Sequence, residues 1–352
     1  MNKTKKKFSE AINDALFFSL KKDKNLLCYG LGINDPKRTF STTFGLLEKF
    51  GKKRVFEVPN SENTIMGLSV GAAIGGIKSV ITHQRLDFFL LAMDQLVNSA
   101  AKWKYMFGRK KSLPITIRLI IGRGWGQGPT HSQNLQSWFY HIPGLKIVCP
   151  SNPMDAKELL INSIFDPNPV IFIEHRWLHN VYGYVKKAKV KKLELKKVLK
   201  SGKDLTLISN GYLTIEAIKA SEILKSHFGI ELEIIDLKII KPLNLNLIFN
   251  SVKKTKRIIC LDTGMTSGSI SSDIVSKILT KYMKKLKSPP IIMGLPDVPI
   301  PSTYSGAKFY INYKDIVFQI LKLMKIKKKV NKKLFKLNKK IDIPGNWFKG
   351  PF

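Results

Sequence analysis

Two kinds of apolar segment alternate along most of this chain of 352 residues. Short runs rich in Val, Ile and Leu are typical of buried strands, and between them lie longer segments whose apolar residues recur at helical spacing. Strand and helix signals that alternate in this way predict βαβ units, and therefore parallel sheets with helices on both faces. We predict an α/β fold made of two doubly wound domains.

The predicted elements fall into two sets that are separated by a lysine-rich segment. The first set has strands at 26–31, 53–58, 79–83, 114–121, 145–149 and 170–174, and helices at 8–20, 43–50, 66–76, 88–107 and 155–165. The second set has strands at 204–209, 231–237, 257–262 and 290–295, and helices at 214–227, 245–253 and 271–283. We therefore expect domains at 1–185 and 204–325, a basic linker at 186–203 and a basic tail at 326–352.

The net charge of +35 raises the alternative of a basic nucleic-acid-binding protein. Only eight of the 60 basic residues are arginine, the residue that nucleic-acid sites favour for its bidentate hydrogen bonds. Lysines spread over a surface explain the charge better, so we expect no specific nucleic-acid partner. The chain has no run of 18 apolar residues, and we expect no membrane span. The three cysteines, Cys28, Cys149 and Cys260, lie in or beside apolar runs and are expected to be buried thiols.

Three polar clusters follow predicted strands, where α/β proteins bind ligands. A glycine-rich loop at 122–128 leads to His131, which is either an acid/base group or a structural histidine. Phe88 follows the strand at 79–83 and is either a stacking platform or part of the core. The third cluster, Glu174–His179, contains two histidines and a glutamate; a metal site is conceivable there, but ion pairs are the better explanation.

A single carboxylate, Glu62, lies between a predicted strand and a helix rich in glycine and alanine. Small side chains let a flat ligand or another backbone approach closely. A glutamate at the start of a helix is more often a cap or a partner of the helix dipole. Glu62 is therefore a candidate for proton transfer on a heteroaromatic cofactor only in combination with the segments around it.

Taken together, these segments resemble the beta subunits of thiamine-diphosphate-dependent 2-oxoacid dehydrogenases over about residues 8–325. The matching segments are Arg54–Pro59 with Ser61 and Glu62, Gly71–Ala73, Asp94–Asn98 with Ala100–Lys102, His131–Gln133, Pro143–Lys146, Pro150–Ser151, Asp155–Lys157, Asp166–Val170, Asp236–Leu237 and Pro242–Leu243. The resemblance implies a pyrimidine-binding domain followed by a transketolase C-terminal-like domain, which agrees with the two predicted sets of elements.

The resemblance also implies roles for individual residues. Glu62 corresponds to the glutamate that hydrogen-bonds the aminopyrimidine ring of the cofactor and promotes removal of the thiazolium C2 proton. Phe88 corresponds to the aromatic residue that packs on the pyrimidine, and His131 to a loop histidine that handles substrate and acyl transfer to a lipoyl group. Some relatives have a potassium site that is built largely from backbone carbonyls. In this chain the corresponding positions are Ile115, Ser163, Ile164, Asp166 and Asn168.

Because the diphosphate–magnesium motif of the GDG…N type is missing from the sequence, the resemblance implies an alpha subunit that holds Mg²⁺ and the diphosphate. The expected assembly is an α2β2 tetramer that serves a lipoyl-bearing acyltransferase, with pyruvate as the expected 2-oxoacid. The alternative from the same superfamily is half of a split transketolase or another two-subunit carbon–carbon ligase. Such a protein is expected in the bacterial cytoplasm, or in the mitochondrial matrix or plastid of a eukaryote.

Two segments depart from the pattern of the relatives. Residues 31–35, Leu-Gly-Ile-Asn-Asp, follow a predicted strand where many relatives carry acidic residues. The loop at 122–128 contains Arg123, Trp125 and Gln127, unlike the corresponding loop of typical pyruvate enzymes. Because that loop borders the substrate side in the relatives, the identity of the 2-oxoacid stays open.

Overall fold

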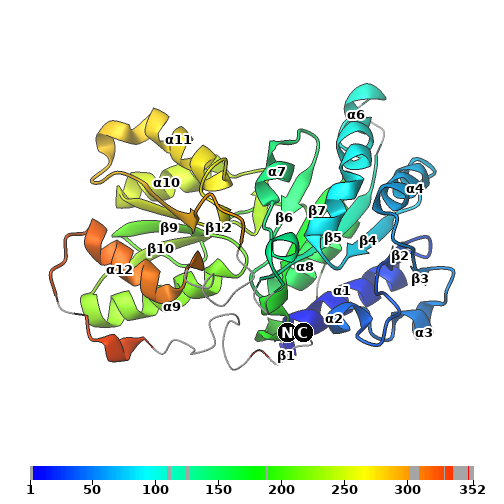
Figure 1. Cartoon of the computed structure of the whole chain (residues 1–352), viewed down its shortest axis with the longest axis horizontal. Helices are drawn as coiled ribbons and strands as arrows, with labels where there is room; N and C mark the ends of the chain where they lie inside the picture. The colour runs from blue at the N-terminus through cyan, green and yellow to red at the C-terminus, as the bar shows by residue number, and fades with distance from the viewer. Residues whose placement is uncertain are drawn as a thin grey trace.

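The computed structural model describes residues 3–108, 112–123, 127–187, 189–300, 309–328, 330–335 and 348. Figure 1 shows two α/β halves side by side, each with a twisted sheet between helices. The N-terminal half carries a seven-stranded sheet and the C-terminal half a four-stranded sheet, while β1 (Thr4–Lys7) and β8 (Tyr182–Val185) form a small antiparallel pair. The predicted fold class, two α/β units built on parallel sheets, is confirmed.

The first sheet has the strand order β11-β6-β7-β5-β4-β2-β3. Six of its strands run parallel: β2 (Leu27–Gly30), β3 (Val55–Glu57), β4 (Ser79–His83), β5 (Ile115–Ile121), β6 (Lys146–Val148) and β7 (Val170–His175). The central strands β4, β5 and β7 are buried along their whole length, as expected for a sheet covered on both faces. Their carboxyl ends lead into the segments that carry the candidate site.

The edge strand β11 (Ile239–Lys241) was not predicted, and it comes from the C-terminal half of the chain. It pairs antiparallel with β6, and the Lys241 ammonium donates hydrogen bonds to the carbonyls of Tyr140 and Ile142 at 2.7 and 2.6 Å. The two halves of the chain are therefore joined by a shared sheet edge in addition to the linker.

Helices cover both faces of the first sheet (Figure 1). On one face α1 (Phe8–Lys22) packs against α8 (Pro153–Ile164), whose first turn is capped by Asn152 through a 3.0 Å hydrogen bond from the Asp155 amide. On the other face lies α4 (Glu62–Ile74), the predicted small-residue helix. The short elements α2 (Arg38–Ser41), α3 (Leu46–Phe50) and α7 (Gln136–His141) complete this half.

The segment at 88–107, predicted as one long helix, is helical but not uniform. It begins as α5 (Leu86–Phe89), passes through a 3₁₀ turn at Leu90–Ala92 and a π-helical stretch at Gln95–Ala100, and ends as α6 (Trp103–Met106). The π-helical hydrogen bond is explicit, because the Ala101 amide donates to the Leu96 carbonyl at 2.9 Å. π-helical turns are frequent at functional sites.

The second sheet is parallel, with the order β10-β9-β12-β13. Its strands are β9 (Leu205–Ser209), β10 (Leu232–Asp236), β12 (Ile258–Met265) and β13 (Ile291–Leu295). Helices α9 (Leu213–Phe228), α10 (Leu245–Thr255) and α11 (Ile270–Tyr282) match predicted helices. An unpredicted helix, α12 (Tyr313–Leu323), packs its apolar side against α9.

Candidate functional site

Glu62 is the first residue of α4, and it lies almost completely inside the protein, with 8% of its surface exposed. Ser61 precedes the helix in a non-helical conformation, and an acid in the first turn is favoured by the helix dipole. Nevertheless, no hydrogen bond or ion pair connects the Glu62 carboxylate to any described residue. The Glu62 oxygens are not among the buried side-chain atoms that lack a partner, so the carboxylate reaches the protein surface, where a ligand can meet it.

Phe88 and His131, to which the resemblance assigns separate roles, lie together in the structure. Their rings meet edge to face, with centroids 5.3 Å apart and planes at 88°. Phe88 is 42% exposed although it is a large apolar side chain, so it is not the core residue that the sequence also allowed. The helix that carries Phe88 continues into the 90–100 segment, which packs against α4. Glu62 and Phe88 therefore come from two helices in contact.

The loop that carries His131 is fixed by a carboxylate that the sequence analysis did not single out. Asp87 is buried, and its Oδ1 accepts hydrogen bonds from the backbone amide and the side-chain amide of Gln133, at 3.2 and 3.0 Å. His131 lies two residues before Gln133, and Phe88 follows Asp87 directly. This pair of hydrogen bonds therefore sets the position of the histidine relative to the aromatic ring. The signal in the sequence was an acid next to Phe88 at the start of a helix.

The residues of the predicted potassium site come together at the turn from α8 to β7. Ser163 and Ile164 end α8, and Asp166 and Asn168 follow in the turn. Ile115 begins β5 beside this turn, where the Leu113 amide donates to the Pro167 carbonyl at 3.0 Å. The Asp166 carboxylate is already engaged, because Oδ2 accepts from Lys146 Nζ at 2.5 Å and Oδ1 from the Asn168 side chain at 2.6 Å. The Ser163 carbonyl accepts hydrogen bonds from the backbone amides of Phe165 and Asp166, so part of the expected carbonyl set is engaged within the turn.

The Glu174–His179 cluster forms an ion pair, as the sequence analysis favoured. Glu174 and Arg118 are both inaccessible to solvent and lie 2.5 Å apart, while His179 Nε2 is 3.8 Å from the other carboxylate oxygen. The charges of Arg118 and His179 outweigh burial and lower the pKa of Glu174, whereas burial lowers the pKa of His179 to about 4. Among the described residues no group of three His, Cys, Asp or Glu side chains could hold a metal ion.

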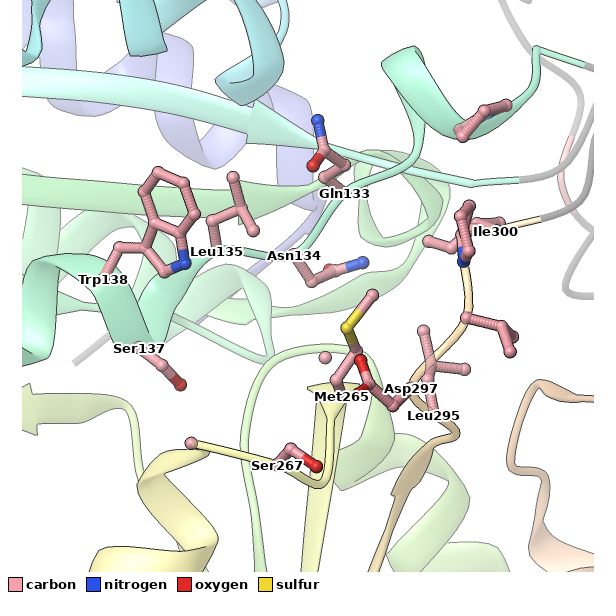
Figure 2. A pocket seen from close by; sticks show the side chains of 15 residues that line it. Gln133, Asn134, Leu135, Ser137, Trp138, Met265, Ser267, Leu295, Asp297 and Ile300 are labelled. Atoms are coloured by element: carbon pink, nitrogen blue, oxygen red, sulfur yellow. The ribbon is translucent and has the colours of Figure 1, made fainter.

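A half-open cavity of about 450 Å³ lies beside the loop after His131 (Figure 2). One wall is formed by Gln133, Asn134 and Trp138, and the opposite wall by Met265, the last residue of β12, and Asp297, which follows β13. The cavity thus lies between the two halves of the chain, at the carboxyl ends of strands of the second sheet. Residues 124–126 of the glycine-rich loop lie outside the described part of the chain.

Apolar side chains are exposed on α4 and on the 88–107 segment, which lie at the same end of the molecule (Figure 1). They are Leu68 (63% exposed), Ile74 (51%), Phe88 (42%), Leu91 (67%), Tyr105 (93%), Met106 (51%) and Phe107 (54%). Single exposed apolar residues are ordinary, but a group of this size on neighbouring elements is typical of a protein–protein interface. All three cysteines are free and buried, as predicted, and no helix among the described residues is long and apolar enough to cross a membrane.

Comparison with known proteins identifies the two halves. The transketolase pyrimidine binding domain matches residues 4–180, and the transketolase C-terminal domain matches residues 196–314. Among solved structures, a split gene transketolase in an inactive beta4 tetramer superposes with a TM-score of 0.69 over 91% of this chain and 99% of that chain. At 18% identity, that likeness concerns the fold alone.

Curated relatives are closer in sequence. The beta subunit of the pyruvate dehydrogenase E1 component of Rhizobium meliloti is 36% identical over 83% of this chain, although the match covers 64% of that longer protein. The protein of the same name from Bacillus subtilis is 33% identical over 88% of this chain and 95% of its own length. The beta subunit of acetoin:2,6-dichlorophenolindophenol oxidoreductase from Bacillus subtilis is 35% identical over 83% of this chain and 89% of its own length. The chain belongs to the transketolase-like family and, within it, to the beta subunits of the thiamine-diphosphate-dependent 2-oxoacid dehydrogenases.

Proposed function

We propose that this chain supplies the pyrimidine side of a thiamine-diphosphate site in a decarboxylating 2-oxoacid dehydrogenase, with pyruvate as the first substrate to test. The observation that carries the proposal is Glu62 at the start of α4, a largely buried residue whose carboxylate reaches the surface without a hydrogen-bond partner among the described residues. It lies on a helix packed against the segment that follows Phe88, whose ring meets that of His131. The Glu62 carboxylate can accept a hydrogen bond and the exposed Phe88 ring can stack, and an aminopyrimidine ring offers a partner for both.

Thiamine diphosphate, when bound, supplies the carbon nucleophile and the electron sink that decarboxylation of a 2-oxoacid requires. Glu62 would accept a hydrogen bond from the protonated ring nitrogen and hold the proton there. The exposed face of Phe88 would support the pyrimidine ring. His131 would move a proton at the substrate oxygen, in a position that Asp87 and Gln133 maintain.

We further propose that an alpha subunit holds Mg²⁺ and the diphosphate in an α2β2 assembly, which delivers its acyl group to a lipoyl-bearing acyltransferase. The exposed apolar side chains on α4 and on the 88–107 segment support an assembly of this kind. The carbonyl-rich turn at 163–168 is proposed as a K⁺ site. The bacterial relatives and a mitochondrial relative from Chaetomium thermophilum favour the bacterial cytoplasm or the mitochondrial matrix as its location.

Co-expression with a partner chain that carries the diphosphate–magnesium motif tests the function directly. The purified complex should reduce an artificial electron acceptor when it is given thiamine diphosphate, Mg²⁺ and a 2-oxoacid, and it should reductively acylate a lipoyl domain. Pyruvate, a branched-chain 2-oxoacid and acetoin are compared, because relatives named for pyruvate and for acetoin match this chain about equally well. Transfer to a sugar or aldehyde, without reduction of the lipoyl domain, would contradict the dehydrogenase assignment and favour the split transketolase.

The outward stripe of α4 predicts a change that blocks assembly without harming the fold. Thr64, Leu68, Gly71 and Gly75 are exposed along one side of the helix, at spacings of three and four residues. A Cβ added at Gly71 would meet nothing within 4 Å, and leucine favours a helix over glycine by about 1 kcal/mol. We therefore expect Gly71→Leu to keep or raise the melting temperature of the chain while it prevents close approach of a partner helix.

Size-exclusion chromatography of co-expressed subunits measures this effect. Gly71→Leu should shift the protein from heterotetramer to free subunits, whereas Ser276→Leu, an exposed change on α11, should leave assembly intact. A normal heterotetramer with Gly71→Leu would show that the outward face of α4 is not part of the interface.

A further inference from the structure

Four arginines gather beneath the carboxyl edge of the first sheet. Arg118 lies on β5, and Arg85, Arg123 and Arg176 follow the ends of β4, β5 and β7, respectively. Arg118, Arg123 and Arg176 are at most 1% exposed. Arginine is almost never fully buried unless it is paired, so Arg123, which forms no ion pair with a described residue, calls for a source of negative charge.

The side chains of Arg85 and Arg176 both pack against the backbone of Gly122. A Cβ built on Gly122 would lie 3.0 Å from Cβ of Arg176 and 3.2 Å from Nη1 of Arg85. Glycine at this position therefore leaves the space in which the Arg85 and Arg176 side chains approach each other, and Arg123 is the next residue along the chain. Burial, together with the charges of Arg123, Arg85 and Arg176, holds the pKa of His175 well below its ordinary value, so His175 stays neutral among them.

No carboxylate of a described residue forms an ion pair with Arg85 or Arg123, although Asp87 acts on Arg85 and Glu216 on Arg123 through their charges. Glu174 is taken by Arg118, and Oδ1 of Asp87 by Gln133. Neither Arg85 nor Arg123 forms an ion pair with a described residue, and burial lowers the pKa of both guanidinium groups. Arg123 Nε and Nη2, and Arg85 Nη1, are buried nitrogens for which the described residues supply no hydrogen-bond acceptor.

Aromatic rings cover the flat faces of the guanidinium groups instead. The Arg123 guanidinium carbon lies 4.0 Å from the ring centroid of Tyr310 and 5.2 Å from that of Trp177. Phe40 packs in the same way on Arg176, at 4.3 Å. Cation–π contacts of this kind hold a guanidinium by its faces and leave the N–H groups at its edge available. The unpartnered nitrogens of Arg85 and Arg123 suit the two oxygens of a carboxylate or a phosphate.

We propose that Arg85 and Arg123, with Arg176 beside them, form a binding site for an anionic group, a carboxylate or a phosphate, at the carboxyl edge of the first sheet. The position agrees with the general rule that parallel sheets bind ligands outside the carboxyl ends of their strands. An anion there would supply the acceptors that Arg123 and Arg85 lack. It would also act on the loop that leads to His131, because Arg85 Nη2 donates a hydrogen bond to Gln127 Oε1.

Binding of two simple anions to the co-expressed complex tests the site without depending on thiamine chemistry. Isothermal titration calorimetry with sodium phosphate and with sodium glutarate, at constant ionic strength, distinguishes a phosphate from a carboxylate ligand. We expect saturable binding of at least one of them. Arg123→Gln and Arg85→Gln should each weaken it about 10- to 100-fold, the effect of removing a charge-assisted hydrogen bond.

Two controls separate a binding site from a structural cluster. Arg257→Gln, at a half-buried arginine just before β12, should leave anion binding unchanged. In the absence of anions Arg123→Gln should not lower the melting temperature, because it removes a buried charge that has no anionic partner. Failure of both anions to bind, equal affinity in both variants, or a lowered melting temperature of the anion-free Arg123→Gln complex would each overturn the proposal. An Arg123→Gln complex that does not fold counts as such a loss of stability and overturns the proposal as well.

Discussion

A complex that carries Glu62→Gln should turn over its 2-oxoacid about 10²–10⁴-fold more slowly than the wild type, the usual contribution of a positioned proton-transfer group. Glutamine keeps the size of the side chain, and the carboxylate makes no hydrogen bond to a described residue that the change would break. The fold should therefore be unaffected, while the ring nitrogen of the cofactor loses the acid that stabilises its proton. Steady-state reduction of an artificial acceptor measures the effect.

The matched control is Glu48→Gln, at an exposed glutamate in the same half of the chain that pairs with Arg38 at 2.8 Å. Exposed ion pairs contribute about 0–1 kcal/mol, so this variant should keep full activity. Thiamine diphosphate affinity and subunit assembly are measured in both variants. Normal turnover of an assembled Glu62→Gln complex would remove Glu62 from the mechanism.

Breaking the Glu174–Arg118 pair should produce the largest loss of stability. Both side chains are inaccessible to solvent, and Arg118 also donates hydrogen bonds to Thr42 Oγ1 at 3.0 Å and Thr82 Oγ1 at 3.3 Å. Removal of one partner leaves the other charge buried, which destabilises a protein by about 3–5 kcal/mol. We expect urea unfolding of Glu174→Gln to show a loss of that size in the free energy of unfolding. That is a large part of the total, because native proteins are stable by only about 5–15 kcal/mol.

Two comparisons show whether the buried charge is the cause. Glu158→Gln breaks an exposed pair with Lys191 and should change the free energy of unfolding by less than about 1 kcal/mol. The double variant Glu174→Leu with Arg118→Met removes both charges and should recover most of the loss, because apolar replacements of buried pairs are often neutral or stabilising. Equal effects of Glu174→Gln and Glu158→Gln would contradict this interpretation of the pair.

The apolar pattern of the sequence was sufficient to predict the sheets, because strands such as β4, β5 and β9 are buried on both faces and appear as continuous apolar runs. Strand β11 was missed for the opposite reason. It is three residues long and exists only because β6 offers an unpaired edge, so its signal lies in the tertiary structure. The prediction of one uniform helix at 88–107 was wrong in its local geometry. The spacing of apolar residues does not distinguish a π-helical turn from an α-helical one.

For the candidate site, the resemblance identified Glu62, Phe88 and His131, and the structure places the last two ring against ring. The residues that hold this arrangement were beyond prediction. Asp87 and Gln133 are 46 residues apart, and Arg118 and Glu174 are 56 apart. Pairings over such distances depend on which strands are neighbours, and a single sequence does not specify that order. For the same reason the sequence did not predict that the arginines at the edge of the sheet lie together. Only Arg123 was noted, as part of a loop that differs from the corresponding loop of the relatives.

The most direct measurement is the rate at which the C2 proton of thiamine diphosphate, bound to the assembled complex, exchanges with deuterium from solvent. Quenched-flow NMR can compare the wild type with Glu62→Gln at equal cofactor occupancy. If the buried Glu62 carboxylate tunes the pyrimidine, exchange should slow by about 10²–10⁴-fold in the variant while cofactor binding persists. Exchange at the same rate in both proteins would contradict that role.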